Sequence, residues 1–341
     1  MSTIKDVAKL AGVSISTVSL ALNNQENVKE ATRKKVLDAV KKLNYRPNRI
    51  AQGLAKNKTN NISFIMSSGL KYGFFSNPVL FEVIKGITEV VNSSGYHLIL
   101  SGTTNEEAFD FIRDQVESRS WDGMILWGTK LDSRQINDLS DGLVPSVCIG
   151  RYSAGKDSYA VNSDDFKGGL LGVRHLLELG HRKIGFIGEV PGSMAAGNRL
   201  SGYTKALEEY GVSLDKNLIV SADFFQESGY KAMQQLLPFY RQGMSAVFAA
   251  SDLMALGAME AILASGLSVP GDISVVGFDN MPNSHLLIVP LTTVAMPLRR
   301  MGEEAAKKLL GLMTGHEVEN ETILDVELVV RSSTKSLDVR R

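Results

Sequence analysis

The sequence predicts an α/β protein with a small helical head and a body of two doubly wound parallel sheets. From residue 61 onward, short apolar runs alternate with helix-like stretches, which is typical of parallel sheets covered by helices on both faces. Residues 1–60 lack this alternation and carry twelve Lys or Arg residues against four acidic ones, although the 341-residue chain has a net charge of zero. The body has about 275 residues, which is more than one such sheet usually holds, so we expect two lobes with a cleft between them.

The composition indicates a reducing compartment. The single cysteine, Cys148, lies in the apolar run VPSVCIG, so we expect a buried, inert thiol and no internal disulfide. The N-terminus MSTIKDVAKLAG has no apolar signal core, and no run of about eighteen apolar residues occurs. We therefore expect a cytoplasmic protein that neither spans a membrane nor is exported.

The first helix of the head is predicted within TIKDVAKLA. Its apolar stripe consists of Ile4, Val7, Ala8 and Ala11. Thr3 precedes the helix as an N-cap, and Gly12 after it tolerates a left-handed turn.

The second helix begins after Ser14, which can cap it, and carries further small hydroxyl side chains among apolar ones. Its inward residues are expected to be Thr17, Val18, Ala21 and Leu22. The hydroxyl groups fit either an ordinary surface helix or a helix that lies against another polymer. The basic head favours the second interpretation, with a polyanion as the partner.

The third helix is predicted within KEATRKKVLDAVKKLNY, where apolar residues lie under a cationic surface. Its apolar face should consist of Ala31, Val36, Leu37, Val40 and Leu43. Pro47 and the polar run AKNKTNN mark a boundary and a linker.

Seven short, mostly apolar runs of the body are predicted to form strands. These are ISFIM, YHLILS, GMILW, SVCIG, KIGFIG, AVFAA and SVVGF. Helices such as VLFEVIKGITEVVNSSG, GGLLGVRHLLELG, RLSGYTKALEEYG and LMALGAMEAILASG separate them and end on glycine.

No motif of enzyme chemistry is present in the sequence. The five histidines lack metal-ligand spacing, and GEVPGSMAAG fits neither a phosphate-binding loop nor a nucleophile elbow. We expect no catalytic residues, no metal and no cofactor. A solute-uptake binding protein would share the two-lobed architecture, but it would need a signal peptide in place of the basic head.

The first helix, the glycine turn and the second helix have the spacing of a helix-turn-helix, whose second helix enters the DNA major groove. TIKDVAKLAGVSISTVSLALNN resembles the head of the lactose-repressor (LacI/GalR) family of bacterial transcription regulators. The similarity continues in order through DGMIL, GHRKIGFIG, RLSGYTKAL, ESGYKAM, SDLMALGAMEAI, ISVVGFDN and PLTTVAMPLRRMGEEAAKKLL. It covers essentially the whole chain.

The resemblance implies a domain scheme with a two-lobed, periplasmic-binding-protein-like body. The parts are a helix-turn-helix domain at 1–46, a hinge helix and linker at 47–60, an effector-binding domain at 61–335 and a tail at 336–341. The N-lobe is expected at about 61–161 plus 292–322, and the C-lobe at about 162–291 plus 323–335.

The resemblance also implies which residues contact DNA. Ile15, Ser16 and Leu20 match positions that face the bases, and other residues match positions that contact phosphates or the minor groove. The full predicted set is Thr3, Ser14, Ile15, Ser16, Thr17, Ser19, Leu20, Asn23, Asn48, Arg49, Ala51, Gln52 and Leu54. Leu20 departs from the family, where a polar or basic side chain is frequent; it could pack on a thymine methyl group or belong partly to the core.

RPNRIAQGLAKN matches the family's hinge helix, in which a leucine, here Leu54, wedges between base steps of the minor groove. A helix of about nine residues is marginal by itself, and Gly53 weakens it further. We therefore expect residues 48–56 to become ordered on operator DNA. The alternative is a plain flexible linker.

In the body, Arg199 and Asp252 match the family's arginine and aspartate that hydrogen-bond the effector. The alternatives are a surface ion pair for Arg199 and a helix N-cap for Asp252. Phe224 matches a position where some relatives stack an aromatic ring, and Asp164 matches a cleft aspartate or a helix cap. The predicted effector contacts are Val79, Leu80, Arg151, Asp164, Arg199, Phe224, Asp252 and Met296.

Three departures from the family pattern make the ligand uncertain. Val79-Leu80 replaces an aromatic pair, Gly150-Arg151 stands where Asp-Arg is common, and Met296 stands where glutamine is frequent. They suggest a less polar pocket than a typical sugar site. The effector class stays open among a sugar, a sugar phosphate and a nucleobase-like compound.

The expected function is that of a homodimeric transcriptional regulator, most readily a repressor, that binds a roughly palindromic operator in double-stranded DNA. A small-molecule effector in the cleft would alter operator affinity through its different affinities for two lobe arrangements. The tail ELVVRSSTKSLDVRR lacks apolar heptads, so we expect a dimer and no C-terminal coiled coil.

Overall fold

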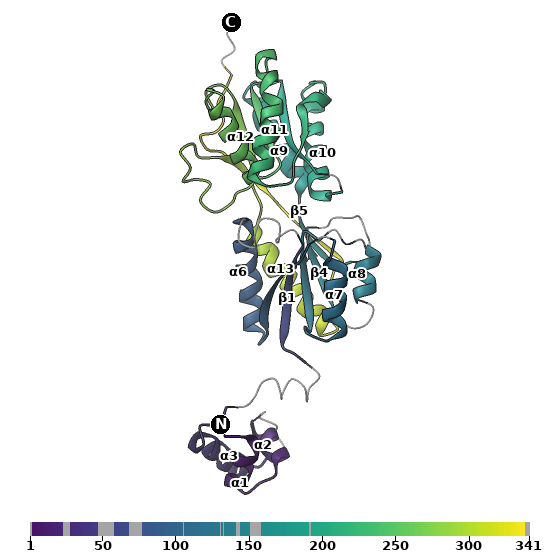
Figure 1. The fold of residues 1–341 in the computed structure, drawn as a ribbon, viewed down its shortest axis with the longest axis vertical. Coiled ribbons are helices and arrows are strands. Elements are labelled where there is room, and N and C mark those ends of the chain that lie inside the picture. The colour runs from purple at the N-terminus through teal and green to yellow at the C-terminus, as the bar shows by residue number, and fades with distance from the viewer. Residues whose placement is uncertain are drawn as a thin grey trace. The chain divides into compact units, whose positions relative to one another are not determined.

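The computed structural model describes the chain in ten segments. These are residues 2–22, 28–46, 58–67, 77–104, 106–129, 131, 133–140, 144–150, 158–190 and 192–337. The chain divides into two compact units, Met1–Thr59 and Asn60–Arg341, of which the second carries both sheets (Figure 1). No helix in these segments is long and apolar enough to cross a membrane.

The first unit consists of three short helices: α1 (Ile4–Ala11), α2 (Ile15–Leu22) and α3 (Glu30–Lys42). Thr3 and Asp6 form a reciprocal capping box at the start of α1, and Gly12 ends the helix with φ 66°. The Ser14 hydroxyl accepts a hydrogen bond from the Thr17 amide, as predicted for the cap of α2. The small core of this unit consists of Val7, Ala8, Val18, Ala21, Val28, Val36 and Ala39.

The predicted inner face of α3 is wrong at two positions. Ala31 is exposed, and Leu37 keeps 43% of its surface exposed, whereas Ala39 is buried. Val36, Ala39 and Leu43 follow the helical repeat and point the same way, while Leu37 lies about a quarter-turn from Val36. The buried face of α3 is therefore narrower than its apolar residues alone suggested.

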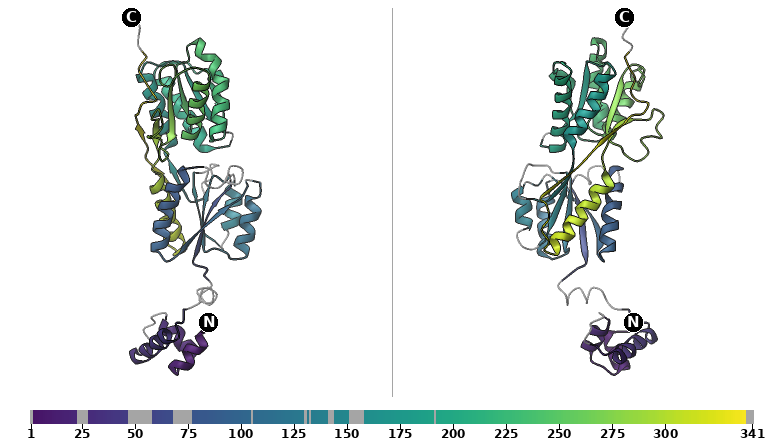
Figure 2. Two further views of the ribbon diagram at one scale, coloured as in Figure 1. Left: turned by 60° about the vertical axis from the view of Figure 1, so that its left-hand side comes forward. Right: turned by 180° about the vertical axis from the view of Figure 1, so that it is seen from behind.

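The first lobe of the second unit has a six-stranded, fully parallel sheet. In order across the sheet, its strands are β11 (Glu321–Leu324), β5 (Ala160–Ser163), β4 (Ser146–Ile149), β3 (Gly123–Trp127), β1 (Asn61–Met66) and β2 (His97–Gly102). The helices of this lobe are α6 (Val79–Ser93), α7 (Ala108–Glu117), α8 (Ser133–Ser140) and α13 (Leu298–Met313) (Figure 2). Cys148 lies buried in β4 as a free thiol, as predicted.

The second lobe repeats this architecture. Its strands in order are β12 (Glu327–Val329), β10 (Thr292–Ala295), β9 (Ser274–Asp279), β8 (Ala246–Ala249), β6 (Ile184–Glu189) and β7 (Ile219–Ser221). Its helices are α9 (Asp165–Glu178), α10 (Met194–Glu209), η1 (Lys216–Leu218), α11 (Gln226–Leu236), η2 (Leu237–Gln242) and α12 (Asp252–Ala264). All pairs are parallel except that of the edge strand β12 with β10. The predicted fold class is confirmed.

The predicted lobe boundary near residue 292 is wrong. Residues 292–295, expected in the N-lobe, form β10 and pair with β9 of the second sheet, so the chain returns to the first lobe only afterwards. Likewise, β11 extends to Leu324 in the first sheet, two residues beyond the expected limit of 322. The chain crosses between the lobes three times, between β5 and α9, between β10 and α13, and between β11 and β12.

Neighbouring helices of the second lobe cross where glycines face each other. A Cβ on Gly169 of α9 would lie 2.2 Å from the Arg199 carbonyl oxygen of α10, and one on Gly202 of α10 would lie 2.2 Å from the Phe166 carbonyl oxygen. Only glycine allows the two backbones to approach this closely. The Gly169 crossing therefore sets the position of Arg199 relative to α9.

We expect Gly169→Ala to lower the free energy of unfolding by about 3 kcal/mol, because a methyl group has no room at this crossing. The measurement is urea unfolding of the full-length protein. Gly197→Ala on α10 is the control, because a Cβ there meets nothing within 4 Å. The control should raise stability by about 0.5–1 kcal/mol, and a similar loss in both variants would contradict the close crossing.

Candidate functional site

One side of α2 is available to a partner. On a helix of about 3.6 residues per turn, Ile15, Ser16, Ser19 and Leu20 share one side, opposite Val18 and Ala21. The side chains facing inward are buried, with Val18 0% and Ala21 1% exposed. Ile15 and Leu20 keep 45% and 39% of their surface exposed, and Ser16 is exposed as well. This exposure excludes the core interpretation of Leu20.

Hydroxyl groups cap the starts of α1 and α2. Ser14 Oγ lies 2.8 Å from Thr17 Oγ1 and caps α2, and Thr3 Oγ1 donates to the Asp6 carboxylate. The exposed cations in the described part of this unit are Lys5, Lys9, Lys29, Lys34, Lys35, Lys41, Lys42, Arg46 and Lys58. An uncharged helix side in a basic unit suits the DNA major groove, where phosphates attract the cations and side chains contact base edges.

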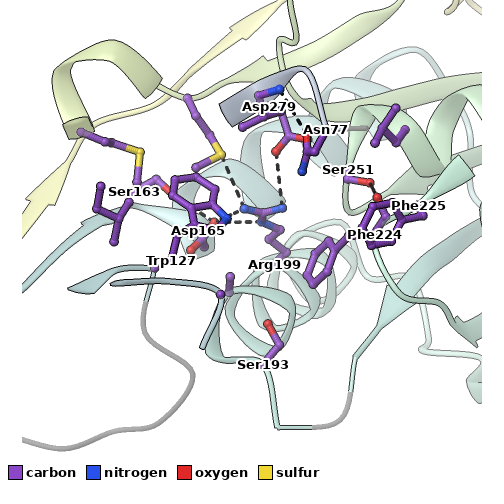
Figure 3. A pocket seen from close by; sticks show the side chains of 18 of the residues that line it. Asn77, Trp127, Ser163, Asp165, Ser193, Arg199, Phe224, Phe225, Ser251 and Asp279 are labelled. Atoms are coloured by element: carbon purple, nitrogen blue, oxygen red, sulfur yellow. Dashed lines mark hydrogen bonds and ion pairs between the residues drawn. The ribbon is translucent and has the colours of Figure 1, made fainter. Parts of the chain in front are cut away.

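The second candidate site is a cleft lined by residues of both lobes (Figure 3). Its described lining residues are Asn77, Val79, Trp127, Gly128, Ile149, Gly150, Ser163, Asp165, Ser193, Ala195, Arg199, Asp223, Phe224, Phe225, Ser251, Leu253, Asp279, Met296 and Met301. They follow the carboxyl ends of several strands, where ligands bind in open α/β sheets.

Arg199 of α10 is held rigidly in this cleft, with only 4% of its surface exposed. Its Nε donates a hydrogen bond to Asp165 Oδ1 at 2.8 Å, its Nη2 forms an ion pair with the same oxygen at 2.7 Å, and Nη1 donates to the Ala250 carbonyl oxygen at 2.5 Å. The Phe278 ring lies under the guanidinium, 3.7 Å from ring centroid to Cζ. Figure 3 shows the guanidinium between Asp165 and Asp279.

Two further carboxyl groups lie next to one another behind this arginine. Asp279 Oδ1 is 3.8 Å from Arg199 Nη1, and Asp279 Oδ2 accepts a hydrogen bond from the Asp252 amide at 3.3 Å. Asp252 is fully buried; its carboxylate accepts from the Thr293 hydroxyl at 2.5 Å and the Met281 amide at 2.8 Å. Burial raises the pKa of Asp252 to about 8, helped by the charge of Asp279. Burial also raises the pKa of Asp279 to about 7, against the opposing charge of Arg199.

This pair predicts a pH-dependent stability. In the unfolded chain both carboxyl groups return towards a pKa of 3.8, so between pH 4 and 8 the folded protein binds more protons than the unfolded one. Stability therefore falls as the pH rises through this range. Asp252→Asn mimics the protonated carboxyl and should be about 1–3 kcal/mol more stable than wild type at pH 8, with a smaller difference at pH 5.

The measurement is urea unfolding at pH 5, 6, 7 and 8. Glu260→Gln, an exposed acid on the same helix α12, is the control and should leave the pH profile unchanged. If Asp252→Asn has the wild-type profile, the buried pair does not govern this dependence.

Comparisons with known proteins find matches in both units of the chain. The sequence model of bacterial regulatory proteins of the lacI family matches residues 3–48, and that of the periplasmic binding protein-like domain matches residues 173–334. The HTH-type transcriptional repressor PurR of Mannheimia succiniciproducens is 35% identical, over 99% of this chain and 100% of that protein. The chain belongs to the LacI family.

Other LacI-family members align over nearly the full length. The repressor CytR of Escherichia coli K12 is 34% identical over 98% of this chain and 97% of that protein. The Lac repressor dimer bound to operator and the anti-inducer ONPF superposes with a TM-score of 0.84, at 31% identity, over 98% of this chain and 99% of that chain. The complex of the regulator CelR with cellobiose gives 0.73, at 32% identity, over 98% and 100%. The protein is thus a sequence-specific DNA-binding repressor of the LacI family, controlled by a small-molecule effector.

Four of the predicted effector residues line the cleft of this LacI-family protein: Val79, Arg199, Phe224 and Met296. The surface ion-pair alternative for Arg199 is wrong, because the guanidinium is buried. Leu80 does not line the cleft; it is 5% exposed and belongs to the first-lobe core.

Both predicted aspartates have structural roles. Asp164 is the N-cap of α9 and accepts from the Lys167 amide at 2.9 Å. Asp252 lies behind the cleft wall, and the N-cap of α12 is its neighbour Ser251. Neither lines the cleft in this structure, because the Asp164 carboxylate caps α9 and the Asp252 carboxylate is buried against Thr293 and Met281.

Sequence reasoning missed Asp165 and Asp279, the two carboxylates that face Arg199. A signal for Asp279 was present, since it directly follows the predicted strand SVVGF at the carboxyl edge of the sheet. The remaining predicted contacts, Arg151, Asn23, Asn48, Arg49, Ala51, Gln52 and Leu54, lie outside the described residues.

Proposed function

We propose that this repressor reads its operator with the exposed side of α2. Ile15, Ser16 and Leu20 would meet base edges in the major groove, with the apolar pair packing on thymine methyl groups. Contacts with phosphates, or support of the helix near the phosphates, would come from Ser14, Thr17, Ser19 and Asn23. Thr3 caps the start of α1. The exposure of Ile15 and Leu20 on a structurally intact helix carries this assignment.

We further propose that residues 1–46 form the DNA-binding domain, and that the segment 47–60 contributes a hinge helix. In it Asn48, Arg49, Ala51 and Gln52 would contact the minor groove, and Leu54 would wedge between base steps. The protein would act in the cytoplasm as a homodimer, without enzymatic activity, on a roughly palindromic operator. A sedimentation mass of four chains would contradict the dimer.

The effector is proposed to bind in the inter-lobe cleft against Arg199, Asp279 and the ring of Phe224. Met296, Val79 and Arg151 would complete the site. The observation that carries this proposal is the fixed Arg199, which lies in a cleft lined by both lobes and is oriented by Asp165 and Phe278. The cellobiose in the CelR complex supports a carbohydrate-sized ligand in a body of this fold.

The test combines operator selection with an effector screen. Full-length protein would select its site from a random duplex pool, and the recovered sequences should be nearly palindromic. A thermal-shift screen of sugars, nucleosides and phosphorylated metabolites would then find compounds that also change operator affinity. Selection of no common sequence, or stabilising compounds that never change operator binding, would contradict the proposal.

A further inference from the structure

We infer that the outer side of α3 is a second DNA-binding surface, which holds the phosphate backbone of a second duplex while α2 is seated on the operator. This contact is independent of base sequence. The surface goes beyond the proposed reading of the operator by α2, and it rests on that function because it needs a head that already holds one duplex.

The lysines of α3 lie away from the core of the head. The buried side of the helix is formed by Val36 and Ala39. Two pairs of exposed lysines, seven residues apart, occupy the rest of the helix surface. At about 3.6 residues per turn, the first lysine of each pair lies opposite the buried side, and the second lies about 100° further round. These four residues, called the α3 lysines, are Lys34, Lys35, Lys41 and Lys42.

The spacing of the two pairs suits the backbone of a duplex. Seven residues of helix rise by about 10 Å, at about 1.5 Å per residue. Phosphates follow one another at about 3.4 Å along the axis of each DNA strand, so the two pairs span about three phosphates. Each ammonium group sits on a flexible stem and binds a phosphate as a point charge, without reading a base.

The charge of the α3 lysines is not neutralised within the head. In the described part of this unit, none of the four forms an ion pair; the ion pair on α3 joins Arg33 Nε to Glu30 Oε2 at 3.6 Å. Asp38 is exposed and lies between the two lysine pairs, so four ammonium groups face one carboxylate there. A surface of this sign attracts a polyanion.

This surface is separate from the exposed side of α2. Val18 and Ala21 of α2 belong to the same small core as Val36 and Ala39 of α3. The exposed sides of the two helices therefore point away from a shared core in different directions. We expect a duplex seated on α2 to leave the α3 lysines open to a second duplex, which would allow direct transfer of the repressor between DNA segments.

The experiment looks for two duplexes on one full-length protein. The selected operator, added at one equivalent, carries one dye, and an unrelated duplex carries another; co-sedimentation of both dyes reports the ternary complex. We expect this complex at low salt. The logarithm of its association constant should fall with the logarithm of salt concentration with a slope of about −3 to −4, because four phosphate contacts contribute about −0.9 each. Absence of a ternary complex at low salt overturns the second surface.

Replacing all four α3 lysines with glutamine should weaken binding of the second duplex at least tenfold more than binding of the operator. Operator binding also shows that the variant is folded. The control removes the same charge from exposed lysines of the second unit, and it should keep the ternary complex. Its four substitutions to glutamine are at Lys205, Lys216, Lys231 and Lys307.

Equal losses in the two variants would show that net charge causes the effect, and they would overturn the assignment to α3. An operator salt slope that becomes shallower by about 3–4 in the α3 variant would show that these lysines contact the operator itself, and it would also overturn a separate surface.

Asp38→Asn tests the surface by a gain of binding. It removes the carboxylate between the two lysine pairs, so the second duplex should bind at least twofold more tightly, with operator affinity changed by less. Weaker binding of the second duplex would contradict the surface.

The two proposals fail in different ways. An intact operator complex that never takes up a second duplex overturns only the α3 surface. Failure to select any operator, or operator binding that Leu20→Glu leaves intact, overturns the proposed function of α2.

Discussion

Replacing Arg199 with alanine should abolish the effect of the effector on operator affinity at concentrations that saturate the wild-type protein. In the proposed site the guanidinium would donate hydrogen bonds to the ligand, and it also neutralises Asp165 and Asp279. Its removal leaves a buried carboxylate without its partner, so we also expect a loss of about 3–5 kcal/mol in the free energy of unfolding. The measurements are operator titrations with and without effector, and urea unfolding.

A second variant distinguishes loss of ligand contacts from loss of folding. Arg199→Met combined with Asp165→Asn removes the ion pair as a whole, so no unpaired carboxylate remains at Asp165, and stability should recover in part. The effector response should stay absent. Arg174→Ala, which breaks an exposed ion pair with Glu209 on the same lobe, is the control and should change neither property. A full effector response in Arg199→Ala would contradict the assignment of the cleft.

Replacing Leu20 with glutamate should weaken operator binding at least ~100-fold, because in the proposed binding mode a carboxylate would enter the major groove near phosphates and an apolar base contact would be lost. Folding should be preserved, since Leu20 is 39% exposed and lies opposite the core of the head. The measurement is a fluorescence anisotropy titration with operator and with unrelated duplex DNA, at fixed salt.

Leu37→Glu is the matched control for this prediction. Leu37 is a leucine of the same unit with 43% exposure, but it lies on α3. The Leu37→Glu substitution adds the same charge to the head but leaves the exposed side of α2 unchanged. It should therefore weaken binding to the operator and to the unrelated duplex similarly, and by less than Leu20→Glu weakens operator binding. Equal effects of the two variants on operator affinity would show that net charge, and not the position on α2, causes the loss.

Local sequence signals determined the elements of this protein. Thr3 and Asp6 form the capping box, Gly12 adopts the left-handed turn, and Ser14 caps α2, because each depends on residues within one helical turn. The apolar runs formed strands because a buried parallel strand needs a continuous apolar segment, which is also a local feature of the sequence. The family resemblance then indicated which architecture these elements build, and the structure places Arg199, to which it also pointed, in the lining of the cleft.

Only the tertiary structure decided which elements and side chains meet. The sequence of residues 292–295 fits a strand of either sheet. The pairing with β9 shows that they belong to the second sheet. Two aspartates, Asp252 and Asp279, both stand at the carboxyl edge of that sheet. The turn after Ser251 points the Asp252 carboxylate at Thr293, whereas the Asp279 carboxylate lies beside Arg199. The sheet that a strand joins and the direction of a carboxylate depend on residues that are far away in the chain. No local sequence pattern contains this information.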